Sequence, residues 1–157
     1  MPRVLIIGYG NPLRADDGVG WRMACRLGEL VRDETFEVLA VHQLTPELAE
    51  PISRAELVIF VDASHNGLPG SWKCERLVLN TALASTLAHH FTPASLLGYA
   101  QAVFQASPPA LVVSVAGESF SYREQLTPAV EAALPQVIEH IHGQIARFRH
   151  GPETSYA

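Results

Sequence analysis

The sequence predicts an α/β protein in which helices cover both faces of a mostly parallel, twisted sheet of about five strands. Short runs of consecutive apolar residues, typical of strands buried on both faces, recur along the 157-residue chain. Between them lie stretches with apolar residues at helical spacing. Strands that alternate with helices form a three-layer α/β/α sandwich. The length suits a single domain with its own core.

The first predicted strand, residues 3–8, is mostly apolar and stops at a glycine. The apolar period then changes to that of a helix, which we expect to run from near Asp17 to near Arg32. Asp16 and Asp17 stand at its start, where a carboxylate suits the free N–H groups and the helix dipole.

The remaining elements alternate in the same way. Three Thr-Pro pairs each place a capping residue before a proline at the first helical position, so each predicts a helix start. The predicted strands span residues 36–41, 57–61, 73–79 and 111–115, and the predicted helices begin at Thr45 (ending near Ser53), Thr92 and Thr127. Pro135 should kink the last helix or mark an irregular first turn. We expect one domain over residues 1–148 and a flexible C-terminal tail over residues 149–157.

Composition narrows the classes of partner. The formal net charge is −5, Lys73 is the only lysine and no basic run occurs, so nucleic acid is a poor candidate partner. No run reaches the roughly 18 apolar residues of a membrane span, and the N-terminal apolar run is too short for a signal peptide. Cys25 and Cys74 lack CxxC spacing, which indicates two reduced thiols in a cytoplasmic protein.

A glycine loop follows the first predicted strand and resembles part of a dinucleotide-binding motif. Gly8 and Gly10 match its first two glycines, but Leu13 stands where the third is required. The second predicted strand also ends without the acidic residue that binds the ribose. Asp16 and Asp17 would repel a pyrophosphate at the helix start. We therefore assign no cofactor-binding residues, and a nucleotide-dependent oxidoreductase is the weakest alternative.

Two aspartates are placed to form a site. Asp17 follows the first predicted strand and Asp62 ends the third. The expected strand order is flavodoxin-like or phosphorylase/hydrolase-like. In the flavodoxin-like order these strands are neighbours, and both carboxylates face one crevice beyond the strand ends. Considered alone, Asp17 would be interpreted as a helix cap and Asp62 as a turn former at a strand end. Together with an imidazole they suit a divalent metal site with open positions, whereas an aspartic-type dyad requires contact at about 3 Å.

Histidine is the expected third ligand. His89 and His90 lie just before the helix start at Thr92, while His42 and His65 lie near strand ends and are competing candidates. The remaining histidines fall in the last helix or the tail, where a solvated surface position is expected. The residues alone leave the choice open.

Residues 8–20, GYGNPLRADDGVG, resemble the opening motif of the hydrogenase maturation endopeptidases. These enzymes remove the C-terminal extension from the large subunit of [NiFe] hydrogenases. Residues 60–63, with the sequence FVDA, match the second acidic position of the family, and residues 125–130 resemble the start of its last helix. The likeness covers nearly the whole chain, with the motifs in the same order.

The resemblance implies a site made of an acid, an aspartate and a histidine. The acid falls on Asp17 and the aspartate on Asp62. The histidine falls on His90 rather than His89, because a proline follows His90 at the family's spacing and leads into a Leu-rich helix. Asp17, Asp62 and Asp16 are the implied catalytic residues. The general base stays open between the two neighbouring aspartates and a metal-bound water.

The implied metal is nickel that arrives with the substrate, and zinc or cadmium could occupy the same ligands in vitro. The expected partner is the precursor of a [NiFe] hydrogenase large subunit, processed by a cytoplasmic, monomeric endopeptidase. Two other functions are also compatible with these residues. One is a hydrolase with its own resident metal, and the other is a non-catalytic, metallochaperone-like partner of the precursor.

Overall fold

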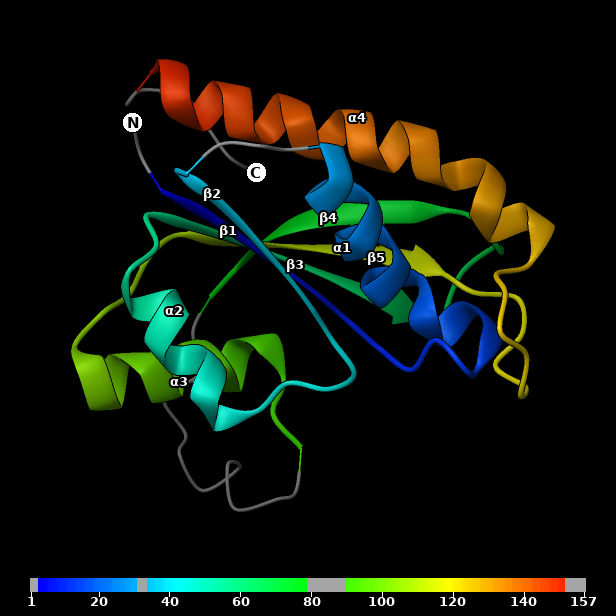
Figure 1. Cartoon of the computed structure of the whole chain (residues 1–157), viewed down its shortest axis with the longest axis horizontal. Coiled ribbons are helices and arrows are strands. Elements are labelled where there is room, and N and C mark those ends of the chain that lie inside the picture. The colour runs from blue at the N-terminus through cyan, green and yellow to red at the C-terminus, as the bar shows by residue number, and fades with distance from the viewer. Residues whose placement is uncertain (1–2, 31–33, 79–89, 152–157) are drawn as a thin grey trace.

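A five-stranded sheet lies between two layers of helices in the computed structural model, which describes residues 3–30, 34–78 and 90–151 (Figure 1). In chain order the elements are β1 (Val4–Tyr9), the 3₁₀ turn η1 (Ala15–Gly18), α1 (Val19–Leu30), β2 (Phe36–Val41), the 3₁₀ turn η2 (Pro46–Leu48), α2 (Ala49–Ser53), β3 (Leu57–Ser64), β4 (Trp72–Leu77), α3 (Pro93–Phe104), β5 (Ala110–Ala116) and α4 (Pro128–His150). The predicted three-layer α/β fold is confirmed.

The strand order is β2-β1-β3-β5-β4, and every pair is parallel except β4 with β5. The expected neighbours β1 and β3 are indeed paired. The order departs from the flavodoxin-like one at its far side, where β5 lies between β3 and the antiparallel edge strand β4. The carboxyl ends of β1, β2, β3 and β5 therefore meet along one edge of the sheet.

Side chains alternate between two cores, one on each face of the sheet. In β3, Ile59 and Val61 pack in the same cluster as residues of α1 and α4, whereas Val58 and Phe60 pack with α2 and α3. Figure 1 shows these helix pairs on opposite faces of the sheet. Burying each large apolar side chain stabilises the fold by about 1.5–3 kcal/mol. The apolar strands of the sequence are thus covered on both faces.

Glycines allow α1 to lie very close to the strand ends. A Cβ on Gly8 would lie 2.0 Å from the carbonyl oxygen of Gly20, and one on Gly20 would lie 2.2 Å from that of Val61. Gly10 has a φ of +142°, and a Cβ there would meet the Asp17 carbonyl oxygen at 1.9 Å. The glycine loop therefore serves a tight strand exit and close packing, which bring the start of α1 over the ends of β1 and β3.

Some boundaries differ from the sequence prediction. The first helix begins with η1 and ends at Leu30, and Arg32 lies outside the described residues. β3 runs to Ser64 because its polar end pairs with β5. α4 continues past Pro135 and through Arg149, which was expected in the tail but donates a 2.7 Å hydrogen bond to the Thr35 hydroxyl. None of the described helices is both long and apolar enough to cross a membrane.

Candidate active site

A cleft of about 450 Å³ opens at the carboxyl end of the sheet. It is lined by the ends of β1 and β3, the loops after β1 and β2, the start of η1–α1 and the segment before α3. The lining residues are Tyr9, Gly10, Asp17, His42, Gln43, Leu44, Asp62, Ala63, His90 and Phe91. Asp17, Asp62 and His90, which come from three distant parts of the sequence, therefore share one cleft.

Asp62 belongs to β3 and is largely buried. Its Oδ2 accepts a 2.8 Å hydrogen bond from the Tyr9 hydroxyl. Its Oδ1 is buried and has no hydrogen-bond partner among the described residues. Burial raises the pKa of Asp62, and Tyr9, the Ser114 hydroxyl in register on β5 and the charge of Lys73 only partly offset this. A buried oxygen without a partner fits an incoming cation, which would lower its energetic cost.

Tyr9 is the last residue of β1. Burial first, and then the neighbouring carboxylates of Asp62 and Asp17, raise the pKa of the Tyr9 phenol well above its usual value. The phenol therefore stays protonated and donates to Asp62. Sequence reasoning did not single out Tyr9, because a tyrosine at the end of an apolar strand carries no distinctive pattern.

Asp17 lies in η1 and faces the cleft with partial exposure. Its Oδ2 accepts a 2.9 Å hydrogen bond from the backbone N–H of Asn11, so the carboxylate also fixes the loop that carries it. Asp17 thus holds the glycine loop from the side that lines the cleft.

His90 is exposed and stands two residues before the N-cap of α3. Thr92 and Ser95 form a capping box, in which the Thr92 hydroxyl accepts from the Ser95 N–H and the Ser95 hydroxyl accepts from the Thr92 N–H. Phe91 packs edge-on against Tyr99, with 5.6 Å between the ring centroids. These contacts fix the backbone next to His90 at the cleft.

The structure distinguishes among the histidines that compete with His90 as candidate ligands. His42 also lines the cleft and lies 6.3 Å, centroid to centroid, from the ring of Trp21. His65 is not among the lining residues and stacks on Phe120 at 3.9 Å. His89 lies outside the described residues. His42 therefore remains the competitor of His90 within the described part of the cleft.

Asp16 has surroundings quite different from those of Asp17. It has no exposed surface and is not among the residues that line the cleft. Its carboxylate accepts four hydrogen bonds, from the backbone N–H groups of Glu118, Ser119 and Thr127 and from the Thr127 hydroxyl. The Asp16 carboxylate therefore holds the loop between β5 and α4 against η1.

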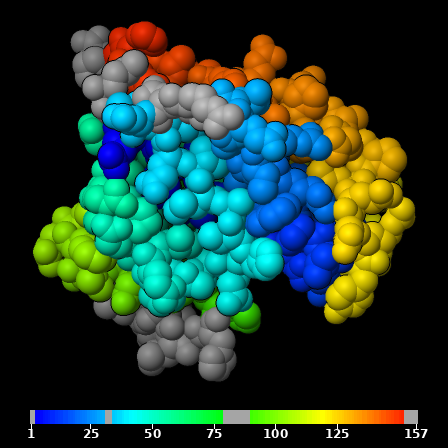
Figure 2. Space-filling view, viewed as in Figure 1, coloured from blue at the N-terminus to red at the C-terminus, as the bar shows by residue number. Residues whose placement is uncertain are grey.

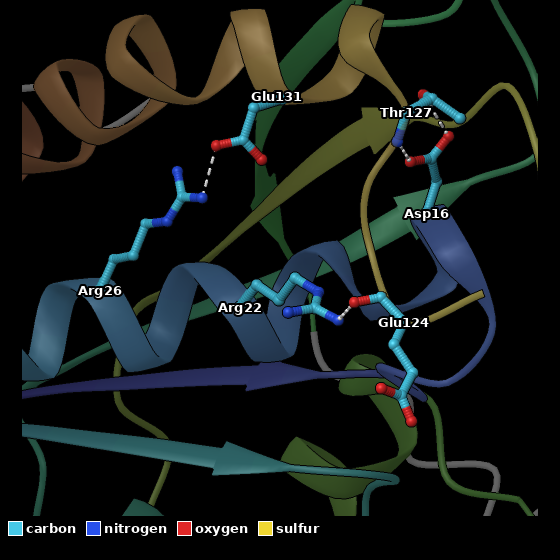
Figure 3. A network of polar contacts seen from close by, with 6 residues as sticks. All are labelled: Asp16, Arg22, Arg26, Glu124, Thr127 and Glu131. Carbon is cyan, nitrogen blue, oxygen red and sulfur yellow. Dashed lines mark hydrogen bonds and ion pairs between the residues drawn. The ribbon is translucent and has the colours of Figure 1, made fainter.

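The loop between β5 and α4 lies against the glycine loop, and Figure 2 shows the yellow and blue segments side by side. The N–H of Ala15 donates to the Arg123 carbonyl, and the N–H of Arg123 donates to the Leu13 carbonyl. Arg22 donates to the Glu124 carbonyl and Arg26 pairs with Glu131 (Figure 3). α1 is thereby tied to the start of α4, and the acid on η1 is held in place.

Within the described part of the chain, the possible metal-binding side chains of the cleft stand apart from one another. Among residues 3–30, 34–78 and 90–151, no three His, Cys, Asp or Glu side chains lie close enough to hold one ion. The carboxylates and the imidazole line the cleft as separate groups. Their donor types suit a divalent cation such as nickel or zinc.

No family model and no curated protein sequence matches the chain. In fold, the chain is similar to a [NiFe] hydrogenase maturation protease, HycI, from Thermococcus kodakarensis KOD1, with a TM-score of 0.75 and 23% identity over 90% of this chain and 91% of that one. It is also similar to the hydrogenase maturating endopeptidase HybD from E. coli (TM-score 0.70, 23% identity, 92% of each chain). A hydrogenase 2 maturation peptidase from Thaumarchaeota archaeon SCGC_AB-539-E09 gives a TM-score of 0.69 at 22% identity, over 91% of this chain and 97% of that chain. The likeness shows a shared fold over nearly the full length of each chain.

Proposed function

We propose that this protein is an endopeptidase that removes the C-terminal extension from the nickel-loaded large subunit of a [NiFe] hydrogenase. The observation that carries the proposal is that Asp17, Asp62 and His90 line one cleft. The resemblance of the glycine-loop motif and the fold shared with solved maturation proteases support the same activity.

In this proposal nickel is part of the substrate, and the protein recognises it. Asp17, Asp62 and His90 contact the ion carried by the precursor. The buried, unpartnered Oδ1 of Asp62 supports this role, because a cation is the partner that such an oxygen lacks.

Recognition of the ion would couple cleavage to nickel insertion. Contacts between the three side chains and the ion hold the precursor so that the scissile peptide lies in the cleft. A precursor without nickel lacks these contacts, so its peptide is not positioned and its cleavage is slow.

Proton transfer needs a group that reaches the substrate. Of the two neighbouring aspartates considered as general base, only Asp17 lines the cleft. We therefore assign proton abstraction from the attacking water to Asp17 and a positioning role to Asp16. Nickel would supply Lewis-acid polarisation of the water or of the scissile carbonyl.

We further propose that the protein works as a cytoplasmic monomer. Its cysteines, Cys25 and Cys74, are both free thiols, as is usual for proteins in a reducing compartment.

Substitution of the proposed ligands tests the assignment. Asp17→Asn, Asp62→Asn and His90→Ala should each abolish shortening of the nickel-loaded precursor, measured by intact mass, while the circular dichroism spectrum stays that of the wild type. Full processing by Asp62→Asn would contradict metal recognition by this cleft.

The histidine assignment needs its own comparison. We expect His90→Ala to be inactive and His65→Ala, which changes a histidine outside the cleft, to process normally. Normal activity in His90→Ala together with loss in His42→Ala or His89→Ala would move the ligand to that histidine.

A further inference from the structure

We propose that Tyr9 is a positioning residue that acts through Asp62, holding one carboxylate oxygen so that the other stays free to bind the metal ion. This inference rests on the proposed function, because it assigns a task to Asp62 at the site described above. It predicts that Asp62 binds the ion through a single oxygen, Oδ1.

The geometry of the sheet places Tyr9 for this task. Gly8 on β1 pairs with Val61 on β3, so the next residues, Tyr9 and Asp62, lie side by side at the end of the two strands. Tyr9 packs against the core cluster formed with α2 and α3, and its hydroxyl lies 2.8 Å from Asp62 Oδ2. β1 is hydrogen-bonded to β2 and β3 on both sides, which leaves the ring on a rigid support.

The two oxygens of Asp62 have opposite surroundings. Oδ2 accepts a hydrogen bond from the Tyr9 hydroxyl, while Oδ1 is buried and accepts none from the described residues. The Ser114 hydroxyl on the neighbouring strand β5 is a second polar group that stabilises the carboxylate. The carboxylate can rotate about its Cβ–Cγ bond unless one oxygen is held. A hydrogen bond from a side chain behind a metal ligand fixes its orientation, and loss of such partners typically reduces metal affinity or activity about 10–100-fold.

A tyrosine is suited to this position. Its hydroxyl is a neutral donor at physiological pH, so it orients the carboxylate without neutralising the charge that the metal ion needs. Replacing Tyr9 by Phe keeps the ring and removes only the donor. Any change in metal binding would then come from the freed Asp62 rather than from lost packing.

The test is a double-mutant cycle on metal binding by the isolated protein. Cd²⁺ is titrated by isothermal calorimetry into the wild type, Tyr9→Phe, Asp62→Asn and the double variant, below the unfolding midpoint of each. Tyr9→Phe should weaken Cd²⁺ binding about 10–100-fold. In the Asp62→Asn background, Tyr9→Phe should cause no further loss, because Tyr9 acts only through Asp62.

Tyr122→Phe is the matched control. It removes the same hydroxyl from an exposed tyrosine. The ring of Tyr122 contacts Arg14, and a phenylalanine at this position can keep that contact. We expect it to bind Cd²⁺ like the wild type.

Three results would overturn the inference: wild-type affinity in Tyr9→Phe, an equal loss from Tyr9→Phe with and without Asp62, or no Cd²⁺ binding by the wild type. Cleavage of the nickel-loaded precursor by the wild type is measured separately. If the wild type cleaves the precursor, the proposed function stands even when the Cd²⁺ measurements overturn the role of Tyr9. If it does not cleave the precursor, the proposed function fails whatever the Cd²⁺ measurements show.

Discussion

The two neighbouring aspartates should respond oppositely to the same substitution. Asp16 is fully buried and accepts four hydrogen bonds, three of them from backbone N–H groups. Asp16→Asn keeps the shape but turns one oxygen into a donor. The amide oxygen is best kept on the side of Glu118 and Ser119, which leaves the amide nitrogen facing the N–H of Thr127.

These contacts determine how much unfolding free energy Asp16→Asn should lose. One buried N–H loses its acceptor, at about 1–3 kcal/mol, and each remaining bond loses about 1 kcal/mol of charge assistance. Because such losses are not additive, we expect Asp16→Asn to lower the free energy of unfolding by about 2–4 kcal/mol. That is a large part of a typical total of about 5–15 kcal/mol. Asp17 accepts a single backbone hydrogen bond, from Asn11, which an amide oxygen can still accept, so Asp17→Asn should cost less than about 1 kcal/mol.

Urea unfolding followed by circular dichroism measures both values, and the precursor assay is run in parallel below each unfolding midpoint. Asp16→Asn should be unstable but active while folded, and Asp17→Asn stable but inactive. Wild-type stability in Asp16→Asn, or a larger stability loss in Asp17→Asn, would refute the assignment of Asp16 to the loop.

Three further predictions use other parts of the structure. Gly8→Ala would place a Cβ 2.0 Å from a backbone oxygen of α1, so it should cost about 1–3 kcal/mol or more in urea unfolding, whereas Gly143→Ala in open space should stabilise α4 by about 0.5–1 kcal/mol. Burial raises the pKa of Asp62, so the folded state binds its proton more tightly than the unfolded chain, and the resulting stability is lost as pH rises from about 4 through the raised pKa. The unfolding free energy of Asp62→Asn relative to that of the wild type should therefore rise as the pH increases toward neutral. A difference between the two that stays constant with pH would contradict this. Thr92→Ala removes the cap next to His90 and should cost about 1 kcal/mol and slow processing, and an unchanged rate would show that the cap does not position the histidine.

Local patterns in the sequence predicted most of the fold. Apolar runs located the strands, and Thr-Pro pairs located the starts of η2, α3 and α4, because both signals act within a few residues. The direction and place of β4 were not predictable in this way. Its alternating residues indicate an exposed strand, but whether it runs antiparallel beside β5 depends on pairing between distant segments.

The position of the candidate site was predictable to a similar degree. The order of strands places Asp17, which follows β1, and Asp62, near the end of β3, in one cleft, as expected for neighbouring parallel strands. The difference between Asp16 and Asp17 was not predictable, because the groups that bury Asp16 come from residues more than 100 positions away. Tyr9 was missed for the same reason, since its role depends on contact with Asp62 on another strand.

The most direct test of the account is incubation of the purified protein with nickel-loaded and nickel-free forms of the same large-subunit precursor, followed by intact-mass measurement. We expect that only the nickel-loaded form loses its C-terminal extension. Equal cleavage of both forms would contradict nickel recognition while leaving the peptidase activity, and an unchanged mass for the nickel-loaded precursor would contradict the account as a whole.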